Sequence, residues 1–167
     1  MGPVTVRSYR PTDHGAGRRL WAELTRQHHR MYGGEGEDGG AGFEEYLARL
    51  DLAGLWVADH ADDGVIGMIG VVLHGRAGEV EPVVVTTSHR HKGVGRLLLR
   101  HVAAEAKKRG MQSLTISPAS RNVDAIRSLH AAGYDVVSSI KLTMDLDGRQ
   151  HDWQRDGLEL HELQFRS

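Results

Sequence analysis

The stretch from Val83 to Arg96 constrains the fold of this 167-residue chain more than any other, because it joins a strand pattern directly to a helix pattern. It reads Val-Val-Val-Thr-Thr-Ser-His-Arg-His-Lys-Gly-Val-Gly-Arg. The β-branched run favours a strand, a short polar turn follows, and the apolar residues then recur at helical spacing. The first backbone N–H groups of a helix are therefore expected beside two glycines.

Arg90, Gly93 and Gly95 stand at this junction with the spacing Arg-x-x-Gly-x-Gly. The first N–H groups of a helix have no intrahelical partners, and the macrodipole adds partial positive charge there. Glycines allow a ligand to approach the backbone closely, and the turn is rich in cationic or polar donors: His89, Arg90, His91, Lys92 and Arg96. The junction therefore predicts binding of an anion, most naturally a phosphate or pyrophosphate.

The common phosphate motifs do not account for this turn. The Gly-x-x-x-x-Gly-Lys-Ser/Thr sequence of a P-loop is absent. A dinucleotide fingerprint needs a third small residue after Gly93 and Gly95, but Leu98 occupies its position. Taken alone, the six residues also fit a tight strand-to-helix turn without a ligand.

Length and composition narrow the class of protein. A chain of this length is most simply a single domain, residues 1–167, with a core of aliphatic residues because aromatic residues are few. The formal net charge of -1 gives no support for a nucleic-acid or membrane-surface partner, and no apolar run approaches membrane-spanning length. The absence of cysteine excludes a disulfide or cysteine nucleophile. The N-terminus lacks a signal sequence, so a cytoplasmic protein is expected.

The eleven histidines are numerous for this length. His28-His29 and His89-x-His91 are the close pairs, and no carboxylate at metal-ligand spacing accompanies them. We therefore expect surface or satisfied core histidines and no metal site.

The periodicity of the chain predicts alternating groups of strands and helices. Asp62-Asp63-Gly64 is a hairpin signal, and Gly110 suits the end of a helix. The expected strands are 4–9, 55–58, 65–73, 79–85, 112–117 and 136–146, and the expected helices are 12–29, 43–50, 94–109 and 122–132. The segment 136–146 alternates apolar and polar residues and is expected to bury one face. The apolar tail at 158–165 fits a last strand, an edge arm or a dimer contact equally well.

Three strands joined by short turns, followed by a strand–helix–strand crossover, predict an α+β fold with a mixed, mostly antiparallel central sheet between helical layers. This order and the glycine turn resemble the GNAT acyl-CoA N-acyltransferase fold over nearly the whole chain. A second match is the stretch from Asn122 to Tyr134, Asn-Val-Asp-Ala-Ile-Arg-Ser-Leu-His-Ala-Ala-Gly-Tyr. It is similar to the family's Asn-x-x-Ala-Ile-x-x-Tyr-x-x-x-Gly-Phe helix.

The resemblance implies a set of residues that bind acetyl-CoA. The strand would pair through its backbone with the pantetheine arm, the turn would hold the pyrophosphate, and Asn122 would contact the arm or the adenylate portion. The residues so implied are Val83, Val84, Val85, Arg90, His91, Lys92, Gly93, Val94, Gly95, Arg96 and Asn122. Pro82 independently favours a bulge or an unpaired edge in this strand, because it has no N–H to donate. An ordinary edge strand is the alternative.

Acetyl transfer to an amine requires a base, because only the neutral amine attacks the thioester. Glu81 is the candidate, and strand alternation is expected to place it on one face with Glu79, Val83 and Val85. Neighbouring carboxylates could raise its pKa, although both could equally be solvated. A backbone N–H of 83–85 would stabilise the thioester oxygen.

Two positions depart from the family pattern. Leu129 stands where many relatives carry the tyrosine that protonates the leaving thiolate, and leucine cannot donate a proton. Ser117 stands where some peptide-acetylating relatives carry a glutamate base. The group that protonates the thiolate is therefore unassigned.

The resemblance places the acceptor beside the loop between the first two helices. Glu35, Glu37 and Asp38 in that loop would attract a cationic amine as an acidic lid, although such a run is also typical of a solvated loop. We expect an acetyl-CoA-dependent N-acetyltransferase, with a homodimer through the C-terminal segment as one option. The alternatives are a non-catalytic acyl-CoA-binding module and an acyltransferase that uses a hydroxyl acceptor or a longer acyl donor.

Overall fold

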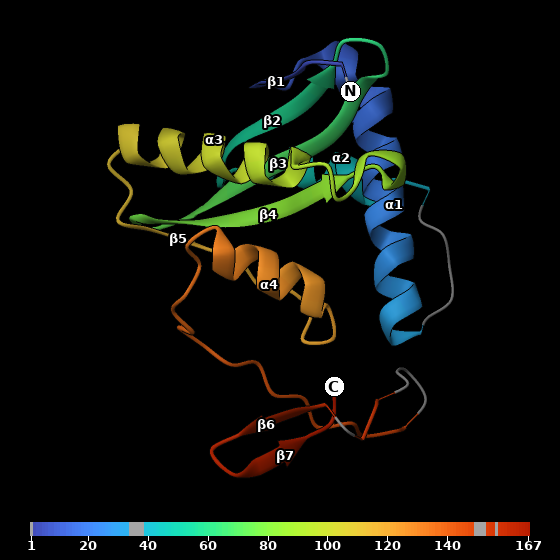
Figure 1. Ribbon diagram of the computed structural model, residues 1–167, viewed down its shortest axis with the longest axis vertical. Helices are drawn as coiled ribbons and strands as arrows, with labels where there is room; N and C mark the ends of the chain where they lie inside the picture. The colour runs from blue at the N-terminus through green and yellow to red at the C-terminus, as the bar shows by residue number, and fades with distance from the viewer. Residues whose placement is uncertain (1, 34–38, 149–152, 156) are drawn as a thin grey trace. The chain divides into compact units, whose positions relative to one another are not determined.

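The computed structural model describes residues 2–33, 39–148, 153–155 and 157–167 (Figure 1). These residues fall into two compact units. The first contains the described residues of 1–25 and 37–116, and the second contains those of 26–36 and 117–167. The single domain expected from the chain length stays a prediction.

A five-stranded sheet organises the first unit, with its strands in chain order. The strands are β1 (Val4–Ser8), β2 (Leu52–His60), β3 (Gly64–His74), β4 (Ala77–Val85) and β5 (Ser113–Thr115). The first four pair antiparallel, and β5 pairs parallel to β4 after the crossover. The predicted α+β fold with a mixed, mostly antiparallel sheet is therefore confirmed.

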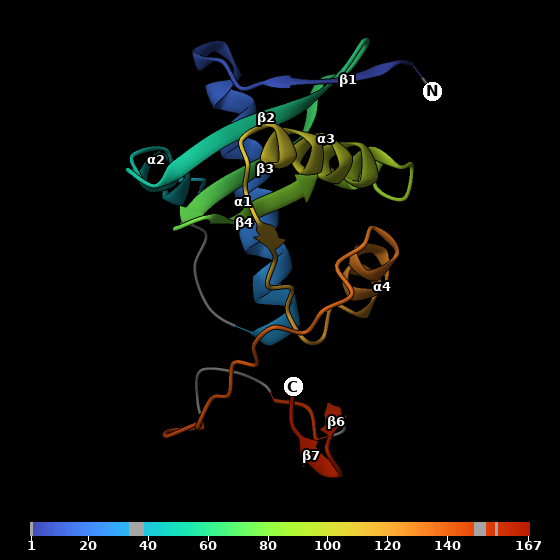
Figure 2. The same ribbon diagram turned by 90° about the vertical axis from the view of Figure 1, so that its left-hand side faces the viewer.

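Helices pack against both faces of this sheet. On one face, Met68 and Val84 share a buried core with residues of α1 (His14–Tyr32) and α2 (Gly42–Leu47), including Leu20 and Phe43. On the other face lies α3 (Val94–Lys108), whose Leu98 approaches Gly67 of β3 (Figure 2). β3 is buried on both faces, which explains why its sequence is a continuous apolar run.

A short 3-10 turn at Pro11–Asp13 precedes α1, and a second one at Thr87–His89 lies between β4 and α3. The predicted stripe of α3 is buried: Val94, Leu98, Leu99, Val102 and Ala106. Gly110 follows this helix with a φ of 69°, a left-handed conformation that glycine adopts without strain. Among the described residues, no helix combines the length and the apolar character needed to cross a membrane.

The second unit contains α4 (Val123–Ala131) and a hairpin of β6 (Leu158–Leu160) and β7 (Leu163–Phe165). Within this unit, the Arg121 guanidinium donates to the carbonyl oxygens of Met31 and Ser167 and lies 5.0 Å from the centre of the Tyr32 ring. The apolar tail, whose structure the sequence left open, is thus a two-stranded hairpin.

The strand expected at 136–146 is absent, and this prediction is wrong. Its apolar residues are exposed: Val136, Ile140, Leu142, Met144 and Leu146 are between 54% and 87% accessible. Alternation forms a half-buried strand only where a neighbouring strand supplies backbone partners and a second layer covers the apolar side. Neither accompanies this segment in the described part of the chain.

Candidate functional site

A β-bulge at Pro82 interrupts the pairing of β4 with β3. Ile69 lies opposite Val83, and Val71 lies opposite Val80, so two steps along β3 correspond to three along β4. Pro82 favoured a bulge or an unpaired edge, and the structure shows a bulge, where a proline can sit without breaking a regular ladder.

The extra residue reverses the side-chain alternation of β4. Directly opposed residues of a pair point to the same face of the sheet. Val83, opposite Ile69, therefore points to the α3 face, whereas Glu79, opposite Val72, points to the face of α1 and α2. Glu81, two residues after Glu79, shares that face. The expectation that Glu79, Glu81, Val83 and Val85 line one face is therefore wrong, because alternation holds only in an unbulged strand.

Both strand carboxylates have cationic or polar partners. Arg49 Nη1 lies 3.2 Å from Glu81 Oε2, and the Glu81 side chain is 45% exposed. Glu79 Oε2 lies 2.7 Å from His74 Nε2. Arg49 also pairs with Asp51 through both ends of its guanidinium, which raises the pKa of Arg49 and lowers that of Asp51. The two glutamates are thus paired with separate residues rather than with each other.

Tyr46 packs beneath the bulge. Its side chain is 3% exposed, and a Cβ atom added to Gly70 of β3 would lie 1.7 Å from its hydroxyl and 2.7 Å from the Glu81 carbonyl oxygen. Burial raises the pKa of Tyr46, and the negative charge of Glu81 raises it further. The glycine therefore permits the close approach of Tyr46 to the bulged segment.

One edge of β4 is open beyond the bulge. β3 pairs with one edge of the strand, and in the described residues β5 pairs with the other edge only at Ala77, Gly78 and Glu79. On that side, residues 83–85 have no neighbouring strand in the described part of the chain (Figure 2). An open edge presents backbone donors and acceptors to which an extended ligand can bind.

The start of α3 has the geometry of an anion site. Gly93 is its N-cap with a φ of 87°, no side chain of the described residues caps the first turn, and that turn contains no acidic residue. His91 also has a positive φ, of 60°. The first N–H groups of α3 are therefore left for an external acceptor.

Space remains where side chains would begin at the two glycines of this turn. A Cβ atom at Gly93 would meet no heavy atom within 4 Å, and one at Gly95 would meet only Val85 Cγ2, at 4.0 Å. Among the described residues, no side chain therefore crowds the Cβ positions of residues 93 and 95.

Two basic residues of the turn stabilise it internally. Arg90 Nε donates to the Val85 carbonyl oxygen at 3.0 Å, and Lys92 Nζ donates to that of Ser88 at 3.0 Å. Glu23 of α1 accepts hydrogen bonds from Thr86 and Thr87. The sequence did not predict this role of Glu23, because two residues 63 positions apart form no local sequence pattern.

Other predicted residues belong to the second unit or lie outside the described residues. Asn122, in the second unit, is the N-cap of α4, and its side-chain oxygen accepts from the Ala125 N–H at 3.2 Å. Leu129 is buried in α4. Glu35, Glu37 and Asp38 of the proposed acidic lid lie outside the described residues. The roles of Glu81 and of Asn122 stay predictions.

A pocket of about 370 Å³ borders the turn. Its lining residues come from α1, the β2–β3 turn, β3 and the turn after β4: Arg19, Asp63, Val65, Ile66, Thr86, Ser88 and His89. The lining includes neither the glycines nor the 83–85 segment, so this pocket is distinct from the open edge of β4.

Comparison with known proteins identifies the family. Residues 20–134 match the model of the acetyltransferase (GNAT) family. The streptothricin acetyltransferase of Streptomyces lavendulae is 33% identical over 104 residues, which cover 61% of this chain and 52% of the relative. The chain therefore spans about half the length of this curated relative.

Solved structures share the fold. A transcriptional regulator from Bacillus halodurans C-125 superposes with a TM-score of 0.65 at 21% identity, covering 86% of this chain and all of the other. A GNAT family acetyltransferase from Brucella melitensis, solved in complex with acetyl-CoA, superposes with a TM-score of 0.60 at 18% identity, covering 75% of this chain and 82% of the other. At these identities the comparison establishes the fold.

Proposed function

Because the chain belongs to the acetyltransferase (GNAT) family, we propose that it transfers an acetyl group from acetyl-CoA to a primary amine by direct attack in a ternary complex. The observation that carries this proposal is the open edge of β4 leading to the uncapped start of α3. An extended edge and an anion site in succession match a ligand that has an amide-containing arm joined to a pyrophosphate.

Acetyl-CoA would bind along this path. The backbone at 83–85 pairs with the pantetheine arm, and the α3 start with its turn, Arg90 to Arg96, binds the pyrophosphate. Phosphate oxygens accept hydrogen bonds from the free N–H groups, and the helix dipole favours their charge. Asn122 would contact the arm or the adenylate portion.

Glu81 would act as the base, directly or through a water molecule. It takes a proton from the ammonium form of the acceptor, and the neutral nitrogen attacks the thioester carbonyl carbon. A carbon–nitrogen bond forms, a backbone N–H of 83–85 stabilises the oxyanion, and the carbon–sulfur bond then breaks. The acetylated nitrogen releases its second proton to solvent, which leaves a neutral amide. The sulfur leaves as a thiolate, and this needs no proton donor near neutral pH because the pKa of a thiol is only about 8.5.

The acceptor would be a cationic amine, of a small molecule or of a lysine side chain. The similarity to a streptothricin acetyltransferase supports including streptothricin among the amines to be tested. The cytoplasmic location and a homodimer through the C-terminal segment stay predictions.

Leu129 motivates a second candidate function. Leucine stands at the position where relatives carry a proton donor, and it cannot donate a proton. This favours a GNAT-fold module that binds acyl-CoA without turnover. Transfer to a hydroxyl, or from a longer acyl donor, is the remaining alternative.

Release of free CoA thiol separates these functions. The purified protein is given acetyl-CoA or succinyl-CoA with streptothricin, aminoglycosides, polyamines and lysine peptides. Glu81→Gln is expected to lower turnover by about 10²–10⁴-fold with an unchanged Kd for CoA.

Glu79→Gln is the matched control for this experiment, since Glu79 lies two residues away on the same face and pairs with His74. It is expected to retain activity. Thiol release by no amine, together with tight CoA binding, would support the binding module instead, and full activity of Glu81→Gln would exclude Glu81 as the base.

A further inference from the structure

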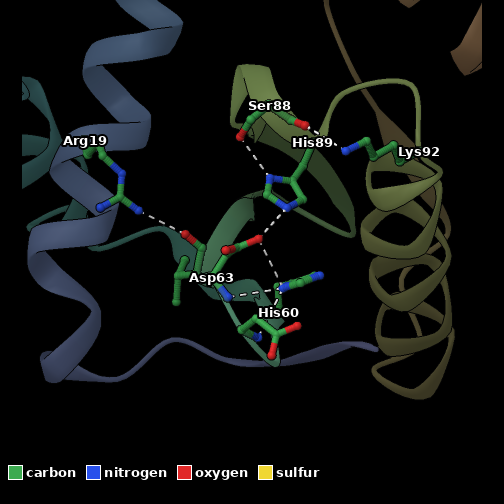
Figure 3. A network of polar contacts seen from close by, with 8 residues as sticks. Arg19, His60, Asp63, Ser88, His89 and Lys92 are labelled. Atoms are coloured by element: carbon green, nitrogen blue, oxygen red, sulfur yellow. Dashed lines mark hydrogen bonds and ion pairs between the residues drawn. The ribbon is translucent and has the colours of Figure 1, made fainter. Parts of the chain in front are cut away.

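Three potential metal ligands meet where the β2–β3 hairpin approaches the turn after β4 (Figure 3). His60 ends β2, Asp63 lies in the hairpin turn, and His89 ends the 3-10 turn before α3. One ligand atom from each lies within 4.8 Å of the other two. All three residues belong to the first unit.

The separations suit a tetrahedral ion. Asp63 Oδ2 lies 3.4 Å from His60 Nδ1 and 3.0 Å from His89 Nε2. Zinc bonds of about 2.0–2.2 Å in a tetrahedral site place neighbouring ligand atoms roughly 3.3 Å apart. Two of the three edges are thus close to the required length, and the third, between the two histidines, is at most 4.8 Å.

The protonation pattern also suits a metal. The backbone N–H groups of Asp62 and Asp63 donate to His60 Nδ1, each at 3.2 Å, so this nitrogen is unprotonated and its electron pair accepts both hydrogen bonds. An ion would take over that electron pair from the two N–H groups. His60 is buried, with 5% of its side chain exposed, which fixes its ring near the other two ligands.

Ser88 supplies an outer partner for His89. Its hydroxyl oxygen lies 3.0 Å from His89 Nδ1, the nitrogen not needed for the ion. When Nε2 binds a metal, Nδ1–H donates to this oxygen and holds the ring in orientation, as outer-shell groups do in metal sites. Nearby cations have other acceptors, since Arg19 donates to the Val65 carbonyl oxygen and Lys92 to that of Ser88.

The site is reachable from solvent. Asp63 is 54% exposed, and Asp63 and His89 both line the pocket of about 370 Å³. A water molecule in this pocket can supply the fourth ligand and an entry path for the ion.

We propose that His60, Asp63 and His89 bind a divalent first-row transition ion, most naturally Zn²⁺. Two imidazole nitrogens and one carboxylate favour this class over Mg²⁺ or Ca²⁺, which prefer oxygen ligands. The bound ion links the β2–β3 hairpin to the turn that precedes α3. Sequence spacing did not predict this site, because His60 ends β2 whereas His89 ends the 3-10 turn before α3, and the two share no local motif.

Binding is tested on the full chain after removal of any affinity tag and of metal. Calorimetric titration with Zn²⁺, and the visible absorption of Co²⁺ in a four-coordinate site, are followed for the parent and variants. The parent is expected to bind one ion per chain. His89→Gln and Asp63→Asn are each expected to weaken binding by about 100-fold or more, and Ser88→Ala by about tenfold.

Controls make the result decisive. His74→Gln alters an exposed histidine that pairs with Glu79 and does not belong to the three-ligand group found among the described residues. This variant is expected to bind Zn²⁺ like the parent. If His60→Gln does not fold, the exposed Asp63 position still provides the test. Undetectable one-to-one binding by the parent, or parent-like affinity in Asp63→Asn, would overturn the proposal.

Discussion

Arg90 donates a hydrogen bond from its Nε to the carbonyl oxygen of Val85, at 3.0 Å. This bond connects the segment just before α3 to Val85, the last residue of β4. It therefore helps to hold the open edge of β4 in place relative to the start of α3. The residue that sequence analysis assigned to the pyrophosphate thus also shapes the turn that would receive it.

Loss of this bond is expected to weaken CoA binding. Arg90→Ala leaves the Val85 carbonyl unpaired and loosens the turn, which we expect to raise the Kd for CoA roughly tenfold, or about 1.4 kcal/mol. Titration calorimetry measures the change. Arg100→Ala removes the same charge from an exposed position of α3 and should bind CoA like the parent; equal affinity of the two variants would contradict a role for the Arg90 bond.

The close approach of Tyr46 to Gly70 leads to a prediction about the free energy of unfolding. Gly70→Ala forces a methyl group against the Tyr46 hydroxyl and the Glu81 carbonyl oxygen, and is expected to lower the free energy of unfolding by about 2–3 kcal/mol. Urea denaturation measures this loss. Gly15→Ala is the control, because a Cβ atom there meets nothing within 4 Å and alanine favours the helix.

The Tyr46 hydroxyl is buried and has no hydrogen-bond partner among the described residues. Removing a buried polar group that lacks a partner costs little, so Tyr46→Phe is expected to leave the free energy of unfolding unchanged or raise it by up to about 1 kcal/mol. It should also recover part of the loss caused by Gly70→Ala. A loss of several kcal/mol in Tyr46→Phe would mean that the hydroxyl has a partner in solution.

The pairing of Arg7 with Asp13 predicts an acid dependence of stability. Hydrogen bonds from Arg7 hold the pKa of the buried Asp13 below its ordinary value, against the opposing effect of burial. A depressed pKa in the folded state stabilises the protein above the unfolded-state pKa, and this contribution is lost as the pH falls through the lower, folded value.

Asp13→Asn is expected to lower the free energy of unfolding by roughly 2 kcal/mol at pH 7, and by progressively less below about pH 4. Urea denaturation of parent and variant across this range isolates the contribution of Asp13 from that of other carboxylates. A difference between the two proteins that does not change with pH would exclude the linkage.

The helices and strands of the first unit could be predicted from the sequence, because each depends on the pattern of residues within its own segment. The spacing of Val94, Leu98 and Val102, with Gly110 after them, identified α3 nearly to the residue. Pro82 identified the bulge. The reversal of faces at Glu81 could not be derived, since the residue at which pairing resumes depends on the neighbouring strand.

Features that depend on distant parts of the chain were missed or misjudged. The alternation of 136–146 predicted a strand, but a strand also requires a partner that the pattern does not specify. The cluster of His60, Asp63 and His89 forms only when two turns of the sheet meet, so histidine spacing gave no indication of it.

Binding of CoA at the start of α3 tests the central proposal most directly. Gly95→Asp adds a carboxylate to the first turn of α3, and Gly95→Ala adds only a methyl group there. Gly15→Asp adds the same charge at an exposed position of α1. In the parent, CoA at 100 times its Kd should raise the free energy of unfolding by about 2.7 kcal/mol. We predict that Gly95→Asp weakens CoA binding by about 100-fold or more, through repulsion of the pyrophosphate, while Gly15→Asp binds like the parent and Gly95→Ala stays within about tenfold of it. Parent-like CoA affinity in Gly95→Asp would contradict the assignment of this turn to the pyrophosphate.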